Sequence, residues 1–343
     1  MMAPTGTDNI SEVSIVIVTS DRYDDLHHCL TELHAHLAKP GTPSAEVITV
    51  HGPNDDAAIA MVTSEFPAVR VRRSKQRHIS RQRNLGALAA RGAVLVYLDD
   101  DAWPRDNWLR ELHAAFTDER VVAASGPVFR GDGSLQCERL AASRIGRLIP
   151  IANGQPIPAA MSPSFSGCNL AIRRSSLLEC GGFDENLPYQ PDDMDVCYRL
   201  YAHANRSRHS MCYREHAAVT HQSSPGPFRR SLEDRAWFTV ARDNLYFAIK
   251  HGGSVYGSVF GSCMQAPKLA RFLVWMLRGK LSPTAFVRCF AKHTTGTIAG
   301  IWKGLTNGPQ LPLRTDAKPA QVSDNRAEEE AACPPPQRTK QPC

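Results

Sequence analysis

Short apolar runs alternate with segments of helical periodicity through the first hundred residues. Each run is rich in Val, Ile or Leu and is bounded by polar or turn-forming residues, as expected of buried parallel strands. Between the runs, apolar residues recur every three or four positions, which is typical of a helix that packs one face on a core. The predicted strands are residues 14–18, 46–50, 69–72 and 93–98, and the predicted helices are residues 26–33, 57–66 and 79–91. This alternation predicts an α/β domain with a mainly parallel sheet flanked by helices.

The rest of the chain has a weaker pattern. The segment from residue 131 to 163 is interrupted by Gly and Pro, and we expect part of it to be a mobile loop. Helical spacing returns at residues 193–204 and 232–251, and residues 266–305 predict two or three further helices. From residue 308 onward Pro, Gln, Ala and charged residues dominate, which predicts a disordered tail. Shorter elements are predicted at residues 108–116, 121–125, 167–173 and 174–180.

Three loops follow the carboxyl ends of predicted strands, at residues 19–22, 51–55 and 99–101. Ligands of parallel α/β sheets bind beyond these ends, so the three loops should converge on one crevice. None of them contains the G-x-G-x-x-G or G-x-x-x-x-G-K-[ST] pattern that cradles phosphates in dinucleotide dehydrogenases and P-loop nucleotidases. Both of these enzyme classes are therefore disfavoured.

The distribution of charge adds to this picture more than the overall composition does. The 343 residues carry 40 Lys and Arg against 34 Asp and Glu, a formal net charge of +6. Residues 244–315 hold 9 basic and no acidic side chains, whereas the part before them is close to neutral. Such a segment can bind nucleic acid or an anionic membrane surface, or it can be a helical cap with a solvated basic face. The apolar run Phe272–Leu277 disfavours nucleic acid, and the other two interpretations stay open.

The sequence contains no recognisable export or membrane signal. Residues 1–12 lack a basic region, and no apolar stretch reaches the roughly 18 residues that a membrane-spanning helix needs. The 10 Cys are scattered without a C-x-x-C pair, which favours reduced thiols. We therefore expect a cytoplasmic protein, peripheral at the inner face of the membrane if the basic segment binds lipid.

The first of two acidic clusters ends the most hydrophobic predicted strand. It consists of Asp99, Asp100 and Asp101, and adjacent carboxylates repel one another unless a cation offsets them. Mg²⁺ and Mn²⁺ prefer such oxygen ligands, and alternation along an extended segment puts Asp99 and Asp101 on the same side. The cluster therefore favours a metal site, and the alternative is a solvated acidic turn.

The second acidic cluster, Asp192, Asp193 and Asp195, opens a predicted helix. Acidic residues favour the first turn of a helix through capping and the helix dipole, and Asp195 can pair with Arg199 one turn later. A carboxylate at such a turn can instead serve as a general base. The sequence alone leaves both interpretations open.

Two single residues give weaker signals. His221 follows a strand-like run, a place where a histidine is more often structural than a metal ligand. Arg83 stands near the start of a helix just before the acidic strand, where an anion contact is favourable. Neither residue is decisive alone.

Taken in chain order, these segments resemble the family 2 glycosyltransferases over about 70% of the chain. Each piece is short and common, and their ordered co-occurrence makes the resemblance specific. The pieces are Val16-Ile-Val-Thr-Ser-Asp-Arg22, Arg83-Asn-Leu-Gly86, Ala90-Arg-Gly92, Leu98-Asp-Asp-Asp101 with Pro104, Gly167-Cys-Asn169, Gly181-Gly-Phe-Asp-Glu185, Asp192-Asp-Met-Asp195 with Arg199, His221, and Arg242-Asp-Asn244. The resemblance implies a GT-A fold, a Rossmann-like nucleotide-diphospho-sugar transferase domain. The implied organisation is an N-terminal tail at 1–11, the GT-A domain at 12–252 with a nucleotide-sugar half at 12–101 and an acceptor half at 102–252, a basic amphipathic helical extension at 253–307 and a disordered tail at 308–343.

The resemblance also implies roles for individual residues. Asp99 and Asp101 match the family's D-x-D motif, so Asp101, Asp99 and His221 are the expected ligands of a divalent metal, Mg²⁺ or Mn²⁺. Asp193 matches the usual general base, and Asp192 is its neighbour in the acidic pair of the family. The residues expected to contact the nucleotide sugar are Thr19, Asp21, Arg22, His51, Asp55, Arg83, Asp99 and Asp100.

Two positions depart from the family pattern. His51 stands where the family often has an Asp that reads a uracil ring, so UDP, dTDP and GDP donors stay open, with Asp55 as a substitute reader. Asp192 replaces the more usual Glu and keeps its charge. The predicted function is an inverting transfer of a sugar from a nucleotide-diphosphate sugar to a hydroxyl of a glycan, a cell-surface polysaccharide or a lipid-linked acceptor. The alternative is a non-catalytic nucleotide-sugar-binding module on the same fold.

Overall fold

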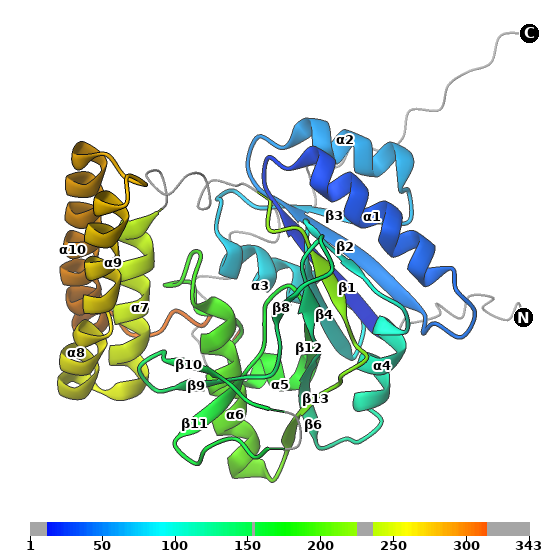
Figure 1. Ribbon diagram of the computed structural model, residues 1–343. Helices are drawn as coiled ribbons and strands as arrows, with labels where there is room; N and C mark the ends of the chain where they lie inside the picture. The colour runs from blue at the N-terminus through cyan, green and yellow to red at the C-terminus, as the bar shows by residue number, and fades with distance from the viewer. Residues whose placement is uncertain (1–11, 153–154, 225–235, 314–343) are drawn as a thin grey trace, which may run out of the picture.

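A seven-stranded sheet runs through the centre of the computed structural model, which describes residues 12–152, 155–224 and 236–313 (Figure 1). Its strands are β1 (Val13–Thr19), β2 (Ala45–His51), β3 (Arg70–Arg73), β4 (Val94–Asp99), β6 (Val121–Ser125), β12 (Leu170–Arg173) and β13 (Ser210–Tyr213). They are arranged in the order β13-β6-β12-β4-β1-β2-β3. β12 is antiparallel to both of its neighbours, and all other neighbouring pairs are parallel. The prediction of a mainly parallel sheet is confirmed.

Helices cover both faces of this sheet. They are α1 (Tyr23–Leu37), α2 (Asp56–Glu65), α3 (Ile79–Ala89), α4 (Trp108–Ala115), α5 (Arg174–Glu179) and α6 (Asp192–Ser207). Alternation along β1 divides the core in two: Ile15 and Ile17 pack with α1, α2 and α4, whereas Val16 and Val18 pack with α3, α5 and α6. Because both faces of β1 are buried, the strand is apolar along nearly its whole length, which made it visible in the sequence.

Short strands lie within residues 131–163, the segment without a clear sequence pattern. β9 (Leu140–Ser143) pairs on one side with β10 (Leu148–Pro150) and on the other with β11 (Met161–Ser164). A separate four-stranded sheet has the order β5-β14-β7-β8 and consists of β5 (Ala102–Pro104), β14 (Val219–His221), β7 (Val128–Phe129) and β8 (Leu135–Cys137). The sequence predicted no strand in residues 131–163, and the expectation that part of this segment is mobile stays a prediction. Runs of two to four residues are too short to display a period of two.

Four helices follow the α/β part: α7 (Trp237–Gly252), α8 (Ser254–Cys263), α9 (Ala266–Leu277) and α10 (Pro283–Thr306). Figure 1 shows α9 and α10 at the outer side of this group, with α7 nearer to the sheet. Glycines let α10 approach α7 closely, because a Cβ at Gly300 would lie 2.4 Å from the carbonyl oxygen of Arg242. The two helices within 266–305 agree with the prediction. Among the described residues, no helix combines the length and apolar character that crossing a membrane requires.

The end of the described chain returns to the α/β part. Leu313 is buried in the core beside α3 and α6, and the Gln310 N–H donates a hydrogen bond of 2.9 Å to Asp184. Within residues 308–313, which the sequence assigned to a disordered tail, Gln310 and Leu313 therefore contact the α/β part. The predicted tails at 1–11 and 314–343 lie outside the described residues. Every Cys that the structure describes is free of a disulfide.

Candidate active site

The acidic cluster at the carboxyl end of β4 meets the loop that follows β1. Asp100 is buried and accepts hydrogen bonds from Thr19 Oγ1 and Arg22 Nη1, both 2.7 Å long. Asp101 is also buried, and its carboxylate accepts bonds from Arg22 Nη2 and from the backbone N–H of Ser224. The loops at 19–22 and 99–101 therefore converge, as their places after parallel strands predicted.

Asp99, Asp101 and His221 form a group that suits a metal ion. One ligand atom from each lies within 4.8 Å of the others. His221 reaches this place because β14 pairs with β5, and His221 lies opposite Ala102, the residue after Asp101. Asp101 Oδ1 and His221 Nε2 are 3.1 Å apart, yet neither buried atom has a well-aligned hydrogen-bond partner among the described residues. Buried polar atoms are rarely left in this state. Two carboxylates and an imidazole with free ligand atoms fit Mg²⁺ or Mn²⁺.

The guanidinium of Arg22 offsets part of the charge of these carboxylates. Burial raises the pKa of Asp100 well above its ordinary value, although Arg22 favours the ionised form. Burial acts in the same direction on Asp101, but His221 and Arg22 outweigh it and hold its pKa well below the ordinary value. Asp101 is therefore an ionised carboxylate at neutral pH, as a metal ligand requires.

The second acidic cluster is linked to the first through Arg83. This guanidinium is only 3% exposed, forms an ion pair with Asp192, and places Nη2 3.2 Å from Asp99 Oδ1. Burial raises the pKa of Asp192 to about 7, against the attraction of Arg83. Arg83 and Asp192 are thus buried partners of each other. The resemblance implied that Arg83 contacts the nucleotide, and the structure shows its guanidinium paired with carboxylates.

Asp193 differs from its neighbour because its side chain is only partly buried. It accepts hydrogen bonds from the backbone N–H of Gly167 at 2.9 Å and of Met194 at 2.8 Å. These bonds hold the carboxylate in one orientation at the start of α6. A carboxylate that is fixed yet accessible has the geometry of a general base.

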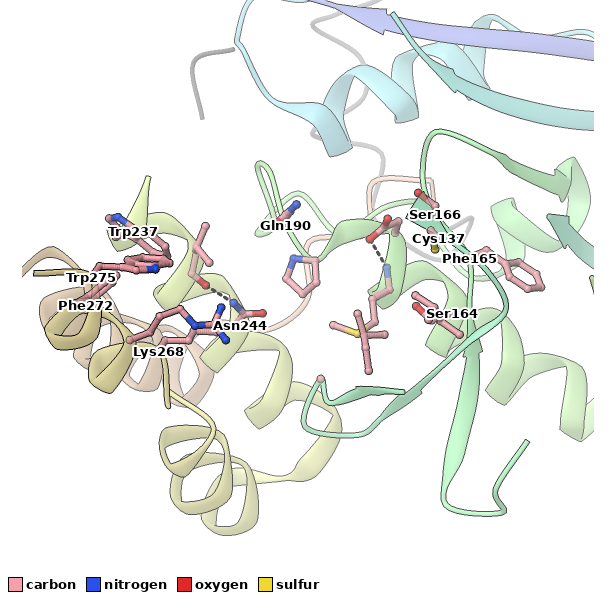
Figure 2. Close-up of a pocket in the computed structure, with 18 residues that line it drawn as sticks. Cys137, Ser164, Phe165, Ser166, Gln190, Trp237, Asn244, Lys268, Phe272 and Trp275 are labelled. Carbon is pink, nitrogen blue, oxygen red and sulfur yellow. Dashed lines mark hydrogen bonds between the residues drawn. The ribbon is translucent and has the colours of Figure 1, made fainter. Parts of the chain in front are cut away.

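A cavity of about 570 Å³ lies beside Asp193. Figure 2 shows it between the helices that carry Trp237, Lys268 and Trp275 and the opposite wall that carries Ser164 and Ser166. The complete lining is Cys137, Leu140, Gly146, Leu148, Ser164, Phe165, Ser166, Gln190, Pro191, Asp193, Met194, Trp237, Val240, Asn244, Lys268, Arg271, Phe272 and Trp275. Its volume falls within the usual range of small-molecule sites, roughly 300–1,000 Å³.

The aromatic wall of this cavity is built by contacts between rings. The Trp237 and Phe272 rings meet edge to face with centroids 4.8 Å apart, and Trp275 lies 5.9 Å from Phe272. His293 stands behind them, fully buried, with its ring 5.7 Å from that of Phe272. The wall therefore has a defined shape that comes from α7, α9 and α10 together.

The remaining predicted donor residues lie in the loops after β1 and β2. His51 is completely buried, with Nδ1 2.8 Å from Asp55 Oδ2 and Nε2 3.0 Å from Thr49 Oγ1. Asp21 has a positive φ of 55° and forms an ion pair with Arg77. His51 and Asp55 are therefore partners of each other, and no recorded contact joins them to the acidic cluster within the described residues.

Several residues that support the site gave no clear signal in the sequence. Gln82 donates through Nε2 to the carbonyl oxygens of Thr19 at 2.8 Å and Val50 at 3.0 Å, which ties the ends of β1 and β2 together. Gln136 Nε2 lies 3.1 Å from Nδ1 of His221 and orients its ring. A glutamine within a helix or short strand is too common to mark either position in advance.

Lys250 connects the helical region to the start of α6. Its Nζ lies 2.8 Å from Asp184 Oδ2 and 2.6 Å from Asp195 Oδ1, and all three side chains are buried. Asp195 also pairs with Arg199 at 2.9 Å, as its spacing predicted. Lys250 is one of several charged residues of α7, so the sequence contained no clear signal for this network.

Comparison with known proteins finds a family match for the first half of the chain. The sequence model of glycosyl transferase family 2 matches residues 14–181. The pre-mycofactocin glycosyltransferases of two strains of Mycobacterium tuberculosis, CDC 1551 / Oshkosh and ATCC 25618 / H37Rv, are each 28% identical over 250 residues. These matches cover 65% of this chain and 48% of each relative, so the chain spans about half the length of the curated relatives it matches.

Two solved structures are similar in fold. GalNAc-T7 with UDP, GalNAc and Mn²⁺ has a TM-score of 0.54 at 17% identity, over 71% of this chain and 48% of that one. The mannosyltransferase PcManGT from Pyrobaculum calidifontis, in complex with GDP-Man and Mn²⁺, has a TM-score of 0.52 at 14% identity, over 86% of this chain and 87% of that one. These likenesses show the GT-A fold that the resemblance implied. Residues 14–181, just under half of the chain, thus match glycosyl transferase family 2, and the fold is that of GT-A glycosyltransferases.

Proposed function

We propose that this protein is a metal-dependent glycosyltransferase that moves a sugar from a nucleotide-diphosphate sugar to an acceptor hydroxyl with inversion. One observation carries the proposal: Asp193, fixed and partly accessible, borders a cavity on one side, and Arg83 joins its neighbour Asp192 to Asp99 on the other. The names of the curated relatives and the nucleotides and Mn²⁺ in the two similar structures support the same reaction class.

The donor is proposed to bind at the carboxyl ends of β1 and β4. Asp99, Asp101 and His221 would hold Mg²⁺ or Mn²⁺, which neutralises charge on the leaving nucleoside diphosphate when bound. Arg22 lies beside Asp100 and Asp101, and its guanidinium would bind the diphosphate as a second cation besides the metal. Thr19 and Asp100 fix this loop through their hydrogen bond.

The other expected donor contacts are proposed with a changed mode of action. Arg83 would act by positioning Asp99 and Asp192, since it is enclosed between them. His51 and Asp55 would shape the floor of the nucleotide site as a hydrogen-bonded pair. Asp21, which is partly exposed, remains free to meet the nucleotide if Arg77 moves.

The acceptor is proposed to enter the cavity beside Asp193. The Gly167 and Met194 N–H groups direct the carboxylate, so that it can take the proton of an acceptor hydroxyl as that oxygen attacks the anomeric carbon. One displacement of this kind inverts the anomeric configuration. The boundary proposed between the donor half, residues 12–101, and the acceptor half, residues 102–252, places Asp193 and most of the cavity in the second half.

The replacement Asp193→Asn tests this assignment. The variant should bind Mn²⁺ and a nucleotide sugar as the native protein does and should lose transfer by roughly 10²–10⁴-fold, the usual contribution of a positioned base. Asp118→Asn is the matched control, because it neutralises a carboxylate on the protein surface. Full transfer by Asp193→Asn would remove Asp193 from the role of base.

A non-catalytic nucleotide-sugar-binding module on the same fold is the second candidate. It is favoured because Arg22 is paired with Asp100, and Arg83 with Asp192, so these side chains already have partners within the protein. The two candidates differ in one inexpensive measurement, the release of nucleoside diphosphate from a panel of nucleotide sugars with Mn²⁺ and without acceptor. Slow release that depends on Mn²⁺ and on Asp101 indicates the enzyme, and binding without any release under all conditions indicates the module.

A further inference from the structure

The three C-terminal helices α8, α9 and α10 have an unusual distribution of large and small side chains. Their inner sides use glycine: a Cβ at Gly257 would lie 2.4 Å from the Ala248 carbonyl oxygen, and one at Gly296 would lie 2.3 Å from that of Phe238. Gly261 and Gly304 face Ala248 and Ile249 in the same way. Small residues here allow close backbone approach to α7, but they leave little apolar side-chain area to bury.

Apart from the cluster around Phe272, many large apolar residues of these helices are exposed. The outer face, as we call it, consists of Val255, Val259 and Phe260 of α8, Leu273, Val274 and Leu277 of α9, and Val287, Phe290, Ile298, Trp302 and Leu305 of α10. Their exposed fractions run from 41% at Val274 and Phe290 to 79% at Val255. In water this arrangement opposes the hydrophobic effect, because the residues with most to gain from burial stay outside. A contiguous exposed apolar surface normally marks an interaction site.

Helix α9 shows the two-sided pattern most clearly. Lys268, Phe272 and Trp275, spaced four and three residues apart, line the cavity beside Asp193. Leu273 and Leu277 lie on the opposite side of the same helix, and Leu277 is 74% exposed. The outer face is therefore distinct from the cavity.

The charge of the C-terminal helices indicates which kind of surface the outer face would bind. The C-terminal helices contain no acidic residue, and exposed basic side chains border the apolar ones, among them Arg278, Lys280, Arg288 and Lys292. A second copy of this chain would bring like charges together, whereas anionic lipid headgroups attract them. Helices with Trp, Leu and Phe on one side and Lys or Arg at its edge are typical of proteins that lie in the plane of a membrane interface.

We propose that the outer face of α8, α9 and α10 binds an anionic membrane surface, with its apolar side chains among the acyl chains and its basic side chains at the headgroups. The binding is peripheral, and it is independent of metal and nucleotide sugar. It goes beyond the proposed transfer reaction and holds even if that reaction is wrong.

Flotation of the full-length protein with vesicles tests the proposal. The protein should float with vesicles of phosphatidylcholine mixed with phosphatidylglycerol, and should float much less with phosphatidylcholine alone or at high salt. The double replacement Leu277→Ser and Trp302→Ser should weaken binding to the anionic vesicles by at least roughly 10-fold, from the loss of two apolar side chains. Leu88→Ser, an exposed leucine of the α/β part, is the matched control and should bind as the native protein does.

Two further measurements decide between occupants. Replacement of Arg288 and Lys292 by Gln should weaken binding roughly fivefold for each charge and flatten its salt dependence, with the melting temperature unchanged. Sedimentation without vesicles should give a monomer for the native protein and for the Leu277→Ser and Trp302→Ser variant. Failure of the native protein to bind anionic vesicles overturns the proposal, as does a native dimer that the double replacement converts to monomer.

Discussion

Arg83 allows a sharp test of what the site requires, because the resemblance assigns it to the nucleotide while the structure surrounds it with carboxylates. The replacement Arg83→Met keeps an unbranched side-chain stem and removes the guanidinium and its charge. Asp192 then stays buried without a cation, and Asp99 loses its contact at 3.2 Å. Removing one partner of a buried ion pair costs about 3–5 kcal/mol. Because burial already raises the pKa of Asp192 to about 7, the carboxyl can take up a proton, and the free energy of unfolding should fall by about the lower end of that range.

A double-mutant cycle separates this cost from other effects of the substitution. In the variant with both Arg83→Met and Asp192→Asn no unpaired charge remains at the Asp192 position, so it should recover a large part of the loss, on the order of 2 kcal/mol. Urea unfolding followed by tryptophan fluorescence measures each corner of the cycle. Arg120→Met serves as the control, because it breaks an exposed pair with Asp118 and should change stability little.

The outcome distinguishes the two roles of Arg83. If it positions Asp99 and Asp192, the doubly replaced variant should be stable, and its affinity for nucleotide sugars should change less than its rate of transfer. The reasoning would be refuted if Arg83→Met unfolded with the native free energy, because the guanidinium would then not compensate Asp192. Loss of nucleotide affinity in such a stable variant would return Arg83 to the direct contact that the resemblance implies.

Three further outcomes follow from the geometry. Asp101→Asn should abolish the increase in melting temperature that Mn²⁺ produces, and removal of metal with a chelator should abolish transfer by the native protein. Gly300→Ala should lower the melting temperature, because overpacking against Arg242 by about 1–3 kcal/mol exceeds a propensity gain of about 1 kcal/mol; Gly308→Ala, in open space, should not. Burial, with help from Lys268, lowers the pKa of His293 from 6.5 to about 4. The unfolded chain therefore binds the extra proton, and stability should fall by up to about 1.4 kcal/mol per unit as pH drops from 6.5 to 4, with a shallower slope in His293→Leu.

The central sheet was predictable because the burial of its strands leaves a pattern within each strand's own sequence. Ile15 and Val16 face opposite layers, so both faces of β1 are buried and the strand appears as an uninterrupted apolar run. The short strands from β8 to β11 could not be recognised in this way. Each depends on a partner several residues away and carries no period of its own.

The candidate site was predictable in proportion to how close its residues lie in sequence. Asp99 and Asp101 are adjacent positions of one motif, whereas His221 joins them only through the pairing of β14 with β5. The burial of Arg83 and His51 was not visible, because a charged or polar residue near a loop resembles a ligand contact until its internal partners are known. The aromatic wall of the cavity was hidden for the opposite reason, since Trp237 and Phe272 resemble ordinary helix core.

The helical region is attached to the α/β part at both of its ends. Lys250 binds Asp184 and Asp195 near its beginning, and after α10 the chain returns so that Gln310 donates to that same Asp184. The carboxylate of Asp184 thus binds the chain both in α7 and after α10. Deleting the region together with the segment that follows it would leave Asp184 without Tyr246, Lys250 and Gln310. Because α7 carries both Trp237 of the aromatic wall and Lys250, a change that shifts this helix alters the cavity and the buried carboxylates together.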